Sequence, residues 1–219
     1  ENPVIGQSLR SISSPVKLHG TVVCLALSGL EKNYYHFNVE YMARIYLVQL
    51  SGLHFDFIDY CCETAFQRQF LELLDIPNEK IIPDYLRGKA ISATKLIVPS
   101  LINNWEYYST HYLHQHHMKQ FIPSWFSEVH KNSRKNVTSS ENIYISRSKA
   151  ERRRIVNEPD VIKLLIEKGF KIYILEELSI VQQIELFNKA RVIIAPHGAG
   201  LANIVFCRPD VKVLEIYPK

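Results

Sequence analysis

The sequence is poor in cysteine, and its cysteines are badly spaced for a metal site or a disulfide framework. Four occur in 219 residues, Cys24, Cys61, Cys62 and Cys207, and no two of them form a CxxC pair. A disulfide-stabilised secreted domain and a structural zinc site are therefore not expected. A reducing compartment is the default for such a chain, and we expect a cytoplasmic protein.

The chain also lacks a long apolar run and a secretion signal. Its longest uncharged apolar stretch, residues 18–30, contains His19, Gly20 and Gly29 and falls short of the roughly 20 residues that a membrane span needs. No basic segment followed by an apolar one opens the sequence. We expect no transmembrane span, which leaves peripheral membrane contact open.

Charged residues are scarce, at 22% of the chain, and the net charge is +4. With 47% hydrophobic residues, the chain has enough apolar material for one large domain or two small ones. Acidic residues slightly outnumber basic ones over residues 1–118, so the positive excess lies in residues 119–219. A modest excess of this kind suits a phosphate-bearing small ligand better than a nucleic acid, and we expect no nucleic-acid partner.

Strand-like apolar runs alternate with helical patterns along the chain, which predicts a parallel α/β structure. The expected strands are residues 21–27, 55–58, 90–98, 142–145, 170–175, 192–195 and 211–216, and the expected helices are residues 33–50, 63–74, 105–121, 159–168 and 180–189. A polar, basic stretch near residues 123–141 is the best domain boundary. We therefore expect an N-terminal α/β domain over residues 1–125, a linker over 126–140 and a C-terminal Rossmann-like domain over 141–219.

Two of the expected helices carry clear end signals. Asn157 is the expected N-cap of the helix at 159–168, and Gly169 is its expected C-terminal stop. Ser179 and Gln182 have the spacing of a capping box in front of the next helix.

The most distinctive segment is APHGAGLAN, residues 195–203, which leaves an apolar strand and opens a short helix. Two glycines spaced GxG allow a tight turn and let backbone N–H groups approach a ligand, and a helix N-terminus attracts phosphate. Asn203 replaces the third glycine of a dinucleotide-binding loop. Glu215 ends the next strand, where a carboxylate can accept hydrogen bonds from ribose hydroxyls. The alternative is a plain strand-to-helix turn, but His197 at the carboxyl end of a strand favours binding.

Arg147 is a second candidate, together with the basic run that follows it. It comes just after the expected strand at 142–145, on the same end of the sheet as His197 if both strands are parallel. Five positive charges fall within residues 147–154. Guanidinium groups match phosphate oxygens, so this segment can clamp a diphosphate; a solvated basic loop is the alternative.

His36 and Glu40 form a third candidate. They are four residues apart on the expected helix at 33–50, so they share one helix face near the carboxyl end of the first strand. Such a pair can act as a general base and its orienting group. The alternative is a half-buried histidine that is hydrogen-bonded near a helix start.

Four histidines, His111, His114, His116 and His117, lie on the expected helix at 105–121. Their spacing lacks the i, i+4 pair with a central Glu, and no cysteine accompanies them. We expect a polar helix face and no metal site, which makes a metal-dependent hydrolase the weakest hypothesis. A lipase-type hydrolase would need a GxSxG nucleophile elbow, and the sequence has none.

Taken together, the order of segments resembles glycosyltransferase family 61. The segments are NYYHFNVEYMARIYLV, YISRSKAERRRIVNE, a glutamine in the helix after Ser179, APHGAGLANIVF and VLEIYP, and they run from about Asn33 to Pro218. Bacterial members of the family are similar to enzymes of capsular-polysaccharide biosynthesis. The resemblance implies a GT-B-like α/β fold, with two Rossmann-like parallel-sheet halves facing a cleft. It also implies an inverting transfer from a nucleoside-diphosphate sugar, with UDP as the first expectation, to a saccharide acceptor, without metal or other cofactor.

The loop chemistry and the resemblance together assign roles to particular residues. The expected donor-binding residues are Arg147, Arg153, Arg154, Asn157, Glu158, His197, Gly198, Ala199, Gly200, Asn203 and Glu215. Of these, Asn157 and Glu158 either orient their loop or touch the nucleotide. Glu40 is the first candidate for the base that takes the acceptor's proton, and His36 is the second.

The ends of the sequence raise an alternative to an active enzyme. The chain begins at Glu1 rather than Met and stops at Lys219 just after a strand-like run. Members of the family usually continue with helices that close the donor domain, so we expect the C-terminal half to be truncated. A non-catalytic α/β module that binds a nucleotide or a glycan without turnover is therefore the second hypothesis.

Overall fold

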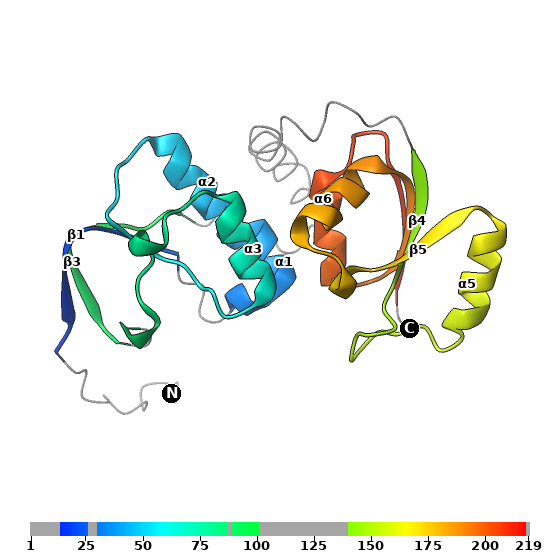
Figure 1. Cartoon of the computed structure of the whole chain (residues 1–219), viewed down its shortest axis with the longest axis horizontal. Helices are drawn as coiled ribbons and strands as arrows, with labels where there is room; N and C mark the ends of the chain where they lie inside the picture. The colour runs from blue at the N-terminus through cyan, green and yellow to red at the C-terminus, as the bar shows by residue number, and fades with distance from the viewer. Residues whose placement is uncertain (1–13, 26–29, 87–88, 101–139, 218–219) are drawn as a thin grey trace, which may run out of the picture.

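The computed structural model describes residues 14–25, 30–86, 89–100 and 140–217. Within these residues the chain forms two parallel α/β halves, which lie side by side in Figure 1. The expected helix at 105–121, its four histidines and nearly all of the linker at 126–140 lie outside the described residues. The predicted domain limits therefore stay a prediction.

The first half has a three-stranded parallel sheet with the order β2-β1-β3. Its strands are β1 (Val16–Cys24), β2 (Phe57–Asp59) and β3 (Ile91–Ile97), and its α-helices are α1 (Tyr34–His36), α2 (Met42–Ser51) and α3 (Ala65–Leu73). Three short 3₁₀ helices complete it: η1 (Leu30–Lys32), η3 (Asn78–Lys80) and η4 (Asp84–Leu86). Helix α3 begins with a capping box in which Thr64 and Gln67 bond reciprocally, which explains why the helix starts where it does.

Strand β1 starts earlier than the apolar pattern predicted. The expected strand began at residue 21, but pairing with β3 extends β1 back to Val16 across a stretch of alternating polarity. The register shifts between Leu18 and Thr21, where Gly20 has a φ of +141°. A Cβ at Gly20 would lie 2.5 Å from Oδ2 of Asp56, so the irregular turn needs glycine.

The expected helix at 33–50 contains a π turn. Residues Phe37–Tyr41 form one π-helical segment, η2, between α1 and α2, and all five are buried. Phe37 stacks on Tyr41 with ring centroids 5.1 Å apart and packs edge-on against Tyr60. This aromatic packing stabilises a turn that hydrophobic periodicity alone does not reveal, and such turns are frequent near functional sites.

Arg44 fills the carboxyl edge of the first sheet. Its guanidinium donates to the backbone carbonyls of Leu25 (2.7 Å), Cys24 (3.1 Å) and Pro99 (3.0 Å), which follow or end β1 and β3. The side chain is buried, and burial lowers its pKa. The chain connections change direction between β1 and β3. An open sheet usually binds ligands at such a point, but here the guanidinium of Arg44 occupies it.

We expect Arg44→Met to lower the free energy of unfolding by about 3 kcal/mol, because it leaves buried carbonyl oxygens without donors. Urea denaturation followed by circular dichroism measures this change. Arg191→Met, which also removes a cation but one on the exposed residue Arg191, is the control and should cost less than about 1 kcal/mol. Equal losses in the two variants would contradict a structural role for Arg44.

The second half has a four-stranded parallel sheet with the order β5-β4-β6-β7. Its strands are β4 (Glu141–Ser146), β5 (Phe170–Ile174), β6 (Ala190–Pro196) and β7 (Lys212–Ile216); its helices are α5 (Glu158–Glu167), α6 (Ile180–Lys189) and the 3₁₀ helices η6 (Leu175–Glu177) and η7 (Ala199–Phe206). The predicted capping box of Ser179 and Gln182 is confirmed. Asn157 does precede α5, but its side chain makes no capping bond.

The two halves share one hydrophobic core. A single cluster of buried side chains includes Val23 of the first sheet and Ile193 of the second. Figure 1 shows α1 and α3 on the side of the first half that faces α6 of the second. Two Rossmann-like parallel α/β regions are thus present, and they pack against each other through this cluster of buried side chains.

Candidate functional site

A cavity of about 490 Å³ lies between the halves. From the first half it is lined by Tyr34, Ala65, Phe66 and Gln69, and from the second by Ile145, Ser146, Arg147, Leu175, Glu176, Leu178, Ile180, Gln183, Ala195, Pro196, Gly198, Ala199, Gly200 and Leu201. Arg147 and Glu176 are the charged residues of this lining. A cleft of this size with few polar groups is typical of a small-molecule site.

The second half contributes the carboxyl ends of β4 and β6 to the cavity. These strands are parallel neighbours, and the chain connections change direction between them, so their ends form a switch point of the sheet. Arg147 follows β4 directly, and Gly198 follows β6. The prediction that these two segments meet at one edge of the sheet is confirmed.

The GxG loop presents its backbone to the cavity. Helix η7 begins at Ala199, directly after Gly198, and residues 198–200 all line the cavity. The first N–H groups of a helix have no intrahelical acceptor, so this turn offers donors to a ligand. Gly200 also lies close to the apolar wall, because a Cβ there would be 2.7 Å from Cδ1 of Leu175.

Arg147 packs its guanidinium against Gly198. A Cβ at Gly198 would lie 2.8 Å from Cζ of Arg147 and would overlap Nη1, so only glycine leaves room for the cation. Nη2 donates to the carbonyl of Arg152 (3.1 Å), whereas Nε is buried and has no hydrogen-bond partner among the described residues. Burial and the neighbouring Arg153 lower the pKa of Arg147. The result is a partly desolvated cation with an unused donor, which favours an anionic ligand.

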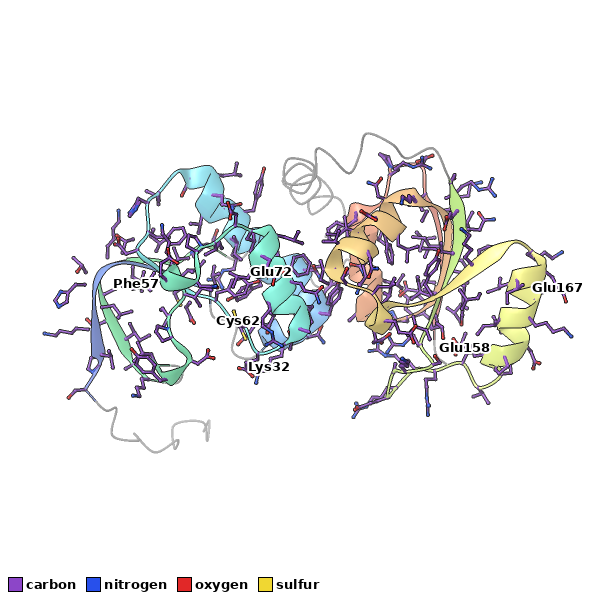
Figure 2. All side chains as sticks on the ribbon, in the orientation of Figure 1. Lys32, Phe57, Cys62, Glu72, Glu158 and Glu167 are labelled. Carbon is purple, nitrogen blue, oxygen red and sulfur yellow. The ribbon has the colours of Figure 1, made fainter. Side chains whose placement is uncertain are left out.

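Glu158 supports the loop that carries Arg147. Its Oε1 accepts a hydrogen bond from the hydroxyl of Tyr144 (2.8 Å) and from the backbone N–H of Arg147 (3.3 Å). Glu158 is the first residue of α5 (Figure 2), and its side chain is buried. Burial of Tyr144 and its hydrogen bond to Glu158 raise the pKa of Tyr144. Glu158 therefore lies where an orienting role requires it, outside the cavity lining, and Asn157 beside it is exposed.

The basic run at Arg152, Arg153 and Arg154 is exposed and does not line the cavity. Arg153 has a left-handed backbone with a φ of +59°. The charge of Arg153 is close enough to affect Arg147, so the run adds positive potential near Arg147. Direct phosphate contacts by Arg153 and Arg154 stay predictions.

His197 is held by Glu215. Nδ1 of His197 lies 2.6 Å from Oε1 of Glu215, and the imidazole stacks on Tyr217 with a centroid distance of 4.9 Å. Neither His197 nor Glu215 is in the cavity lining. One oxygen of Glu215, the residue predicted to bind ribose, is thus engaged in orienting the imidazole.

Asn203 joins the two halves. Its side chain is fully buried, its Oδ1 accepts from the hydroxyl of Tyr34 (2.7 Å), and its Nδ2 donates to Oε1 of Gln183 (2.9 Å). Burial raises the pKa of Tyr34. The predicted donor-loop asparagine therefore connects the loop to the first half of the protein, and a nucleotide contact by Asn203 stays a prediction.

The two candidates for the catalytic base, Glu40 and His36, are not part of the cavity lining. Nδ1 of His36 lies 3.2 Å from Oε1 of Glu40, without the alignment of a hydrogen bond. Glu40 is 8% exposed, and both residues continue the helix that begins at the cavity-lining Tyr34. Their catalytic roles stay predictions.

Sequence reasoning missed several lining residues. Glu176 follows the end of β5, so the carboxyl-end rule could have found it. Phe66 and Gln69 lie on α3, and Leu178 precedes α6; no local signal marks them, because their position depends on how the two halves pack.

In the described ranges, no group of three or more His, Cys, Asp or Glu side chains could hold a metal ion. Nor does any helix within those ranges have the length and apolarity needed to cross a membrane.

The sequence matches the model of a known protein family. The family model for Glycosyltransferase 61 matches residues 34–214, which include both walls of the cavity. The chain belongs to glycosyltransferase family 61. No curated protein matches the sequence as a relative. As a member of family 61 the protein is a glycosyltransferase enzyme. This favours an enzyme that transfers a sugar over a non-catalytic binding module.

Proposed function

We propose that this family 61 enzyme transfers a sugar from a nucleoside-diphosphate sugar, UDP-linked in the first instance, to a hydroxyl of a saccharide acceptor. The proposal includes inversion at the anomeric carbon, no requirement for metal or cofactor, and a GT-B-like arrangement with the donor in the C-terminal half. The single observation that carries it is that Nε of Arg147, buried beside the Gly198 turn, has no hydrogen-bond partner in the part of the chain that the structure describes. A diphosphate supplies the oxygens that such donors need.

The reaction breaks the bond between the anomeric carbon and the terminal phosphate oxygen and forms a bond to the acceptor oxygen. Negative charge then develops on the leaving diphosphate. The guanidinium of Arg147 and the backbone N–H groups of residues 198–200 can stabilise this charge without reorganising, because their positions are fixed in the folded protein. A base takes the proton of the acceptor hydroxyl as the bond forms.

Glu40 stays the first candidate for the base and His36 the second. We expect Glu40→Gln to lower kcat by about 100-fold or more with little change in KM for the donor, because general-base catalysis typically contributes that much. Glu176→Gln, which removes the carboxylate of the cavity lining, is the matched control, and we expect less than about 10-fold loss. The opposite order of effects, measured as UDP release at saturating substrate, would move the base to Glu176.

The direct test of the proposed function is product formation. The protein is incubated with a panel of UDP-sugars and oligosaccharide acceptors in buffer containing EDTA, and products are analysed by mass spectrometry. We expect one acceptor to gain the mass of one sugar residue, with release of one UDP per product and an inverted anomeric centre by NMR. Transfer that occurs only after a divalent metal is added, or transfer with retention, would contradict those parts of the proposal.

The biological setting is proposed on the resemblance of the motifs. We place the enzyme in the cytoplasm, in capsular-polysaccharide or other glycan biosynthesis, with a nucleotide sugar and a saccharide acceptor as its partners. The modest net charge of +4 supports a phosphate-bearing small ligand rather than a nucleic acid. Peripheral contact with a membrane is compatible with an acceptor that is carried there.

A further inference from the structure

Gln69 on α3 reaches across the boundary between the halves. Its Oε1 accepts a hydrogen bond from the backbone N–H of Ile180 at 2.7 Å. Ile180 is the first residue of α6, where a backbone N–H has no acceptor within its own helix. Gln69 therefore caps a helix of the second half, and it also lines the cavity.

This contact fixes which way the side-chain amide points. A backbone N–H can only donate, so the atom that faces Ile180 must be the amide oxygen of Gln69. Nε2 is then the remaining polar atom, with two N–H donors. It makes no hydrogen bond to any part of the chain that the structure describes.

The surroundings of Nε2 suit a sugar ring. Ala65 and Phe66 line the same wall of the cavity, and the Phe66 ring packs edge-on against Tyr34 with centroids 5.2 Å apart. A sugar ring has an apolar C–H face and polar oxygens around its edge, so an aromatic surface beside a fixed donor can bind both. On the other side of the cavity, the guanidinium of Arg147, whose Nε has no hydrogen-bond partner within the described ranges, favours phosphate.

We propose that Gln69 is a sugar-recognition residue: its Nε2 donates a hydrogen bond to an oxygen of the sugar in the bound nucleotide sugar. This inference rests on the proposed function, because it places the sugar between the diphosphate at Arg147 and the wall formed by α3. Gln69 thereby combines two roles, since the bond that caps α6 also presents the donor.

Two variants separate these roles. Gln69→Glu keeps an oxygen for the Ile180 N–H and places a negative charge at a helix N-terminus, so we expect an unchanged or higher Tm. Gln69→Met removes the cap, so we expect a lower Tm. Both variants lose the donor, and both should weaken binding of a UDP-sugar by about 3- to 10-fold, which is the usual effect of one neutral hydrogen bond.

Binding is measured by isothermal titration calorimetry with UDP and with whichever of UDP-glucose, UDP-galactose and UDP-N-acetylglucosamine binds the wild-type protein best. UDP alone should bind the Gln69→Met variant within about twofold of wild type, because UDP carries no sugar beyond the ribose and methionine adds no charge to the cavity. Glu72→Gln, a charge change at an exposed position of the same helix, is the control and should alter neither affinity (Figure 2).

Each other outcome overturns the inference. Equal weakening for UDP and the UDP-sugar would place Gln69 at the nucleotide, and an effect confined to KM for the acceptor would place it at the acceptor. Unchanged UDP-sugar affinity with altered Tm would leave Gln69 a structural cap only. If the wild-type protein binds UDP and a UDP-sugar and both variants bind them with wild-type affinity, only the inference about Gln69 fails. If the wild-type protein binds neither UDP nor a UDP-sugar, the proposed function fails as well.

Discussion

Replacing Arg147 with alanine is expected to weaken binding of UDP by at least about 100-fold, because the variant loses two charge-assisted hydrogen bonds to the diphosphate. The free energy of unfolding should stay within about 1 kcal/mol of wild type, because within the described residues the Arg147 side chain makes a single hydrogen bond, to the backbone of Arg152 in an exposed loop. Burial disfavours the charged form of Arg147, so this cation contributes little to folding. Titration calorimetry gives the affinity, and urea denaturation gives the stability.

Two further variants test whether charge or geometry matters at this position. Arg147→Lys keeps the charge but loses the guanidinium fork, so we expect an intermediate affinity. Arg152→Ala removes one cation from the same loop at an exposed position and should change the affinity less than about threefold. If Arg152→Ala and Arg147→Ala weaken UDP binding equally, the general positive potential of the loop binds the ligand and the specific site is wrong.

Gly198→Ala is expected to produce nearly the same loss of UDP affinity as Arg147→Ala, although Gly198 has no side chain of its own. The added Cβ would overlap the guanidinium of Arg147 and force it away from the turn. The backbone at Gly198 is extended, with a φ of 169°, so alanine causes no backbone strain. Because a flexible side-chain end moves aside at small cost, we expect the free energy of unfolding to fall by less than about 1 kcal/mol.

The double variant Arg147→Ala/Gly198→Ala decides whether the two residues act together. If the methyl group acts only by displacing Arg147, the double variant binds UDP no more weakly than Arg147→Ala alone, and the cycle is strongly non-additive. Additive losses in the calorimetric affinities would mean that Gly198 contributes in another way, such as close approach of its own N–H to the ligand.

The edge of the second sheet could be predicted from sequence because simple rules govern it. Apolar runs separated by helical patterns predict parallel strands, and residues that follow such strands must gather at one edge. Arg147 and the Gly198 turn therefore could be placed together before their contact was known. The same rule also points to Glu176, which directly follows the expected strand at 170–175.

Features that depend on packing between the halves could not be predicted. Asn203 fits a phosphate-loop pattern, yet its side chain is hydrogen-bonded to Tyr34 and Gln183 from distant segments. Gln69 lies on an ordinary amphipathic helix, and its contact with Ile180 follows from how α3 meets α6. The π turn at Phe37–Tyr41 is likewise set by aromatic packing rather than by periodicity.

The central claim is that the cavity between the halves binds a nucleoside diphosphate at Arg147 without metal. A crystal structure of the protein grown with UDP and EDTA tests this claim most directly. We predict that the diphosphate will lie within hydrogen-bond distance of the guanidinium of Arg147 and of the backbone N–H groups of residues 198–200. A diphosphate bound elsewhere on the protein, or one that is seen only when a divalent metal is supplied, would contradict the claim.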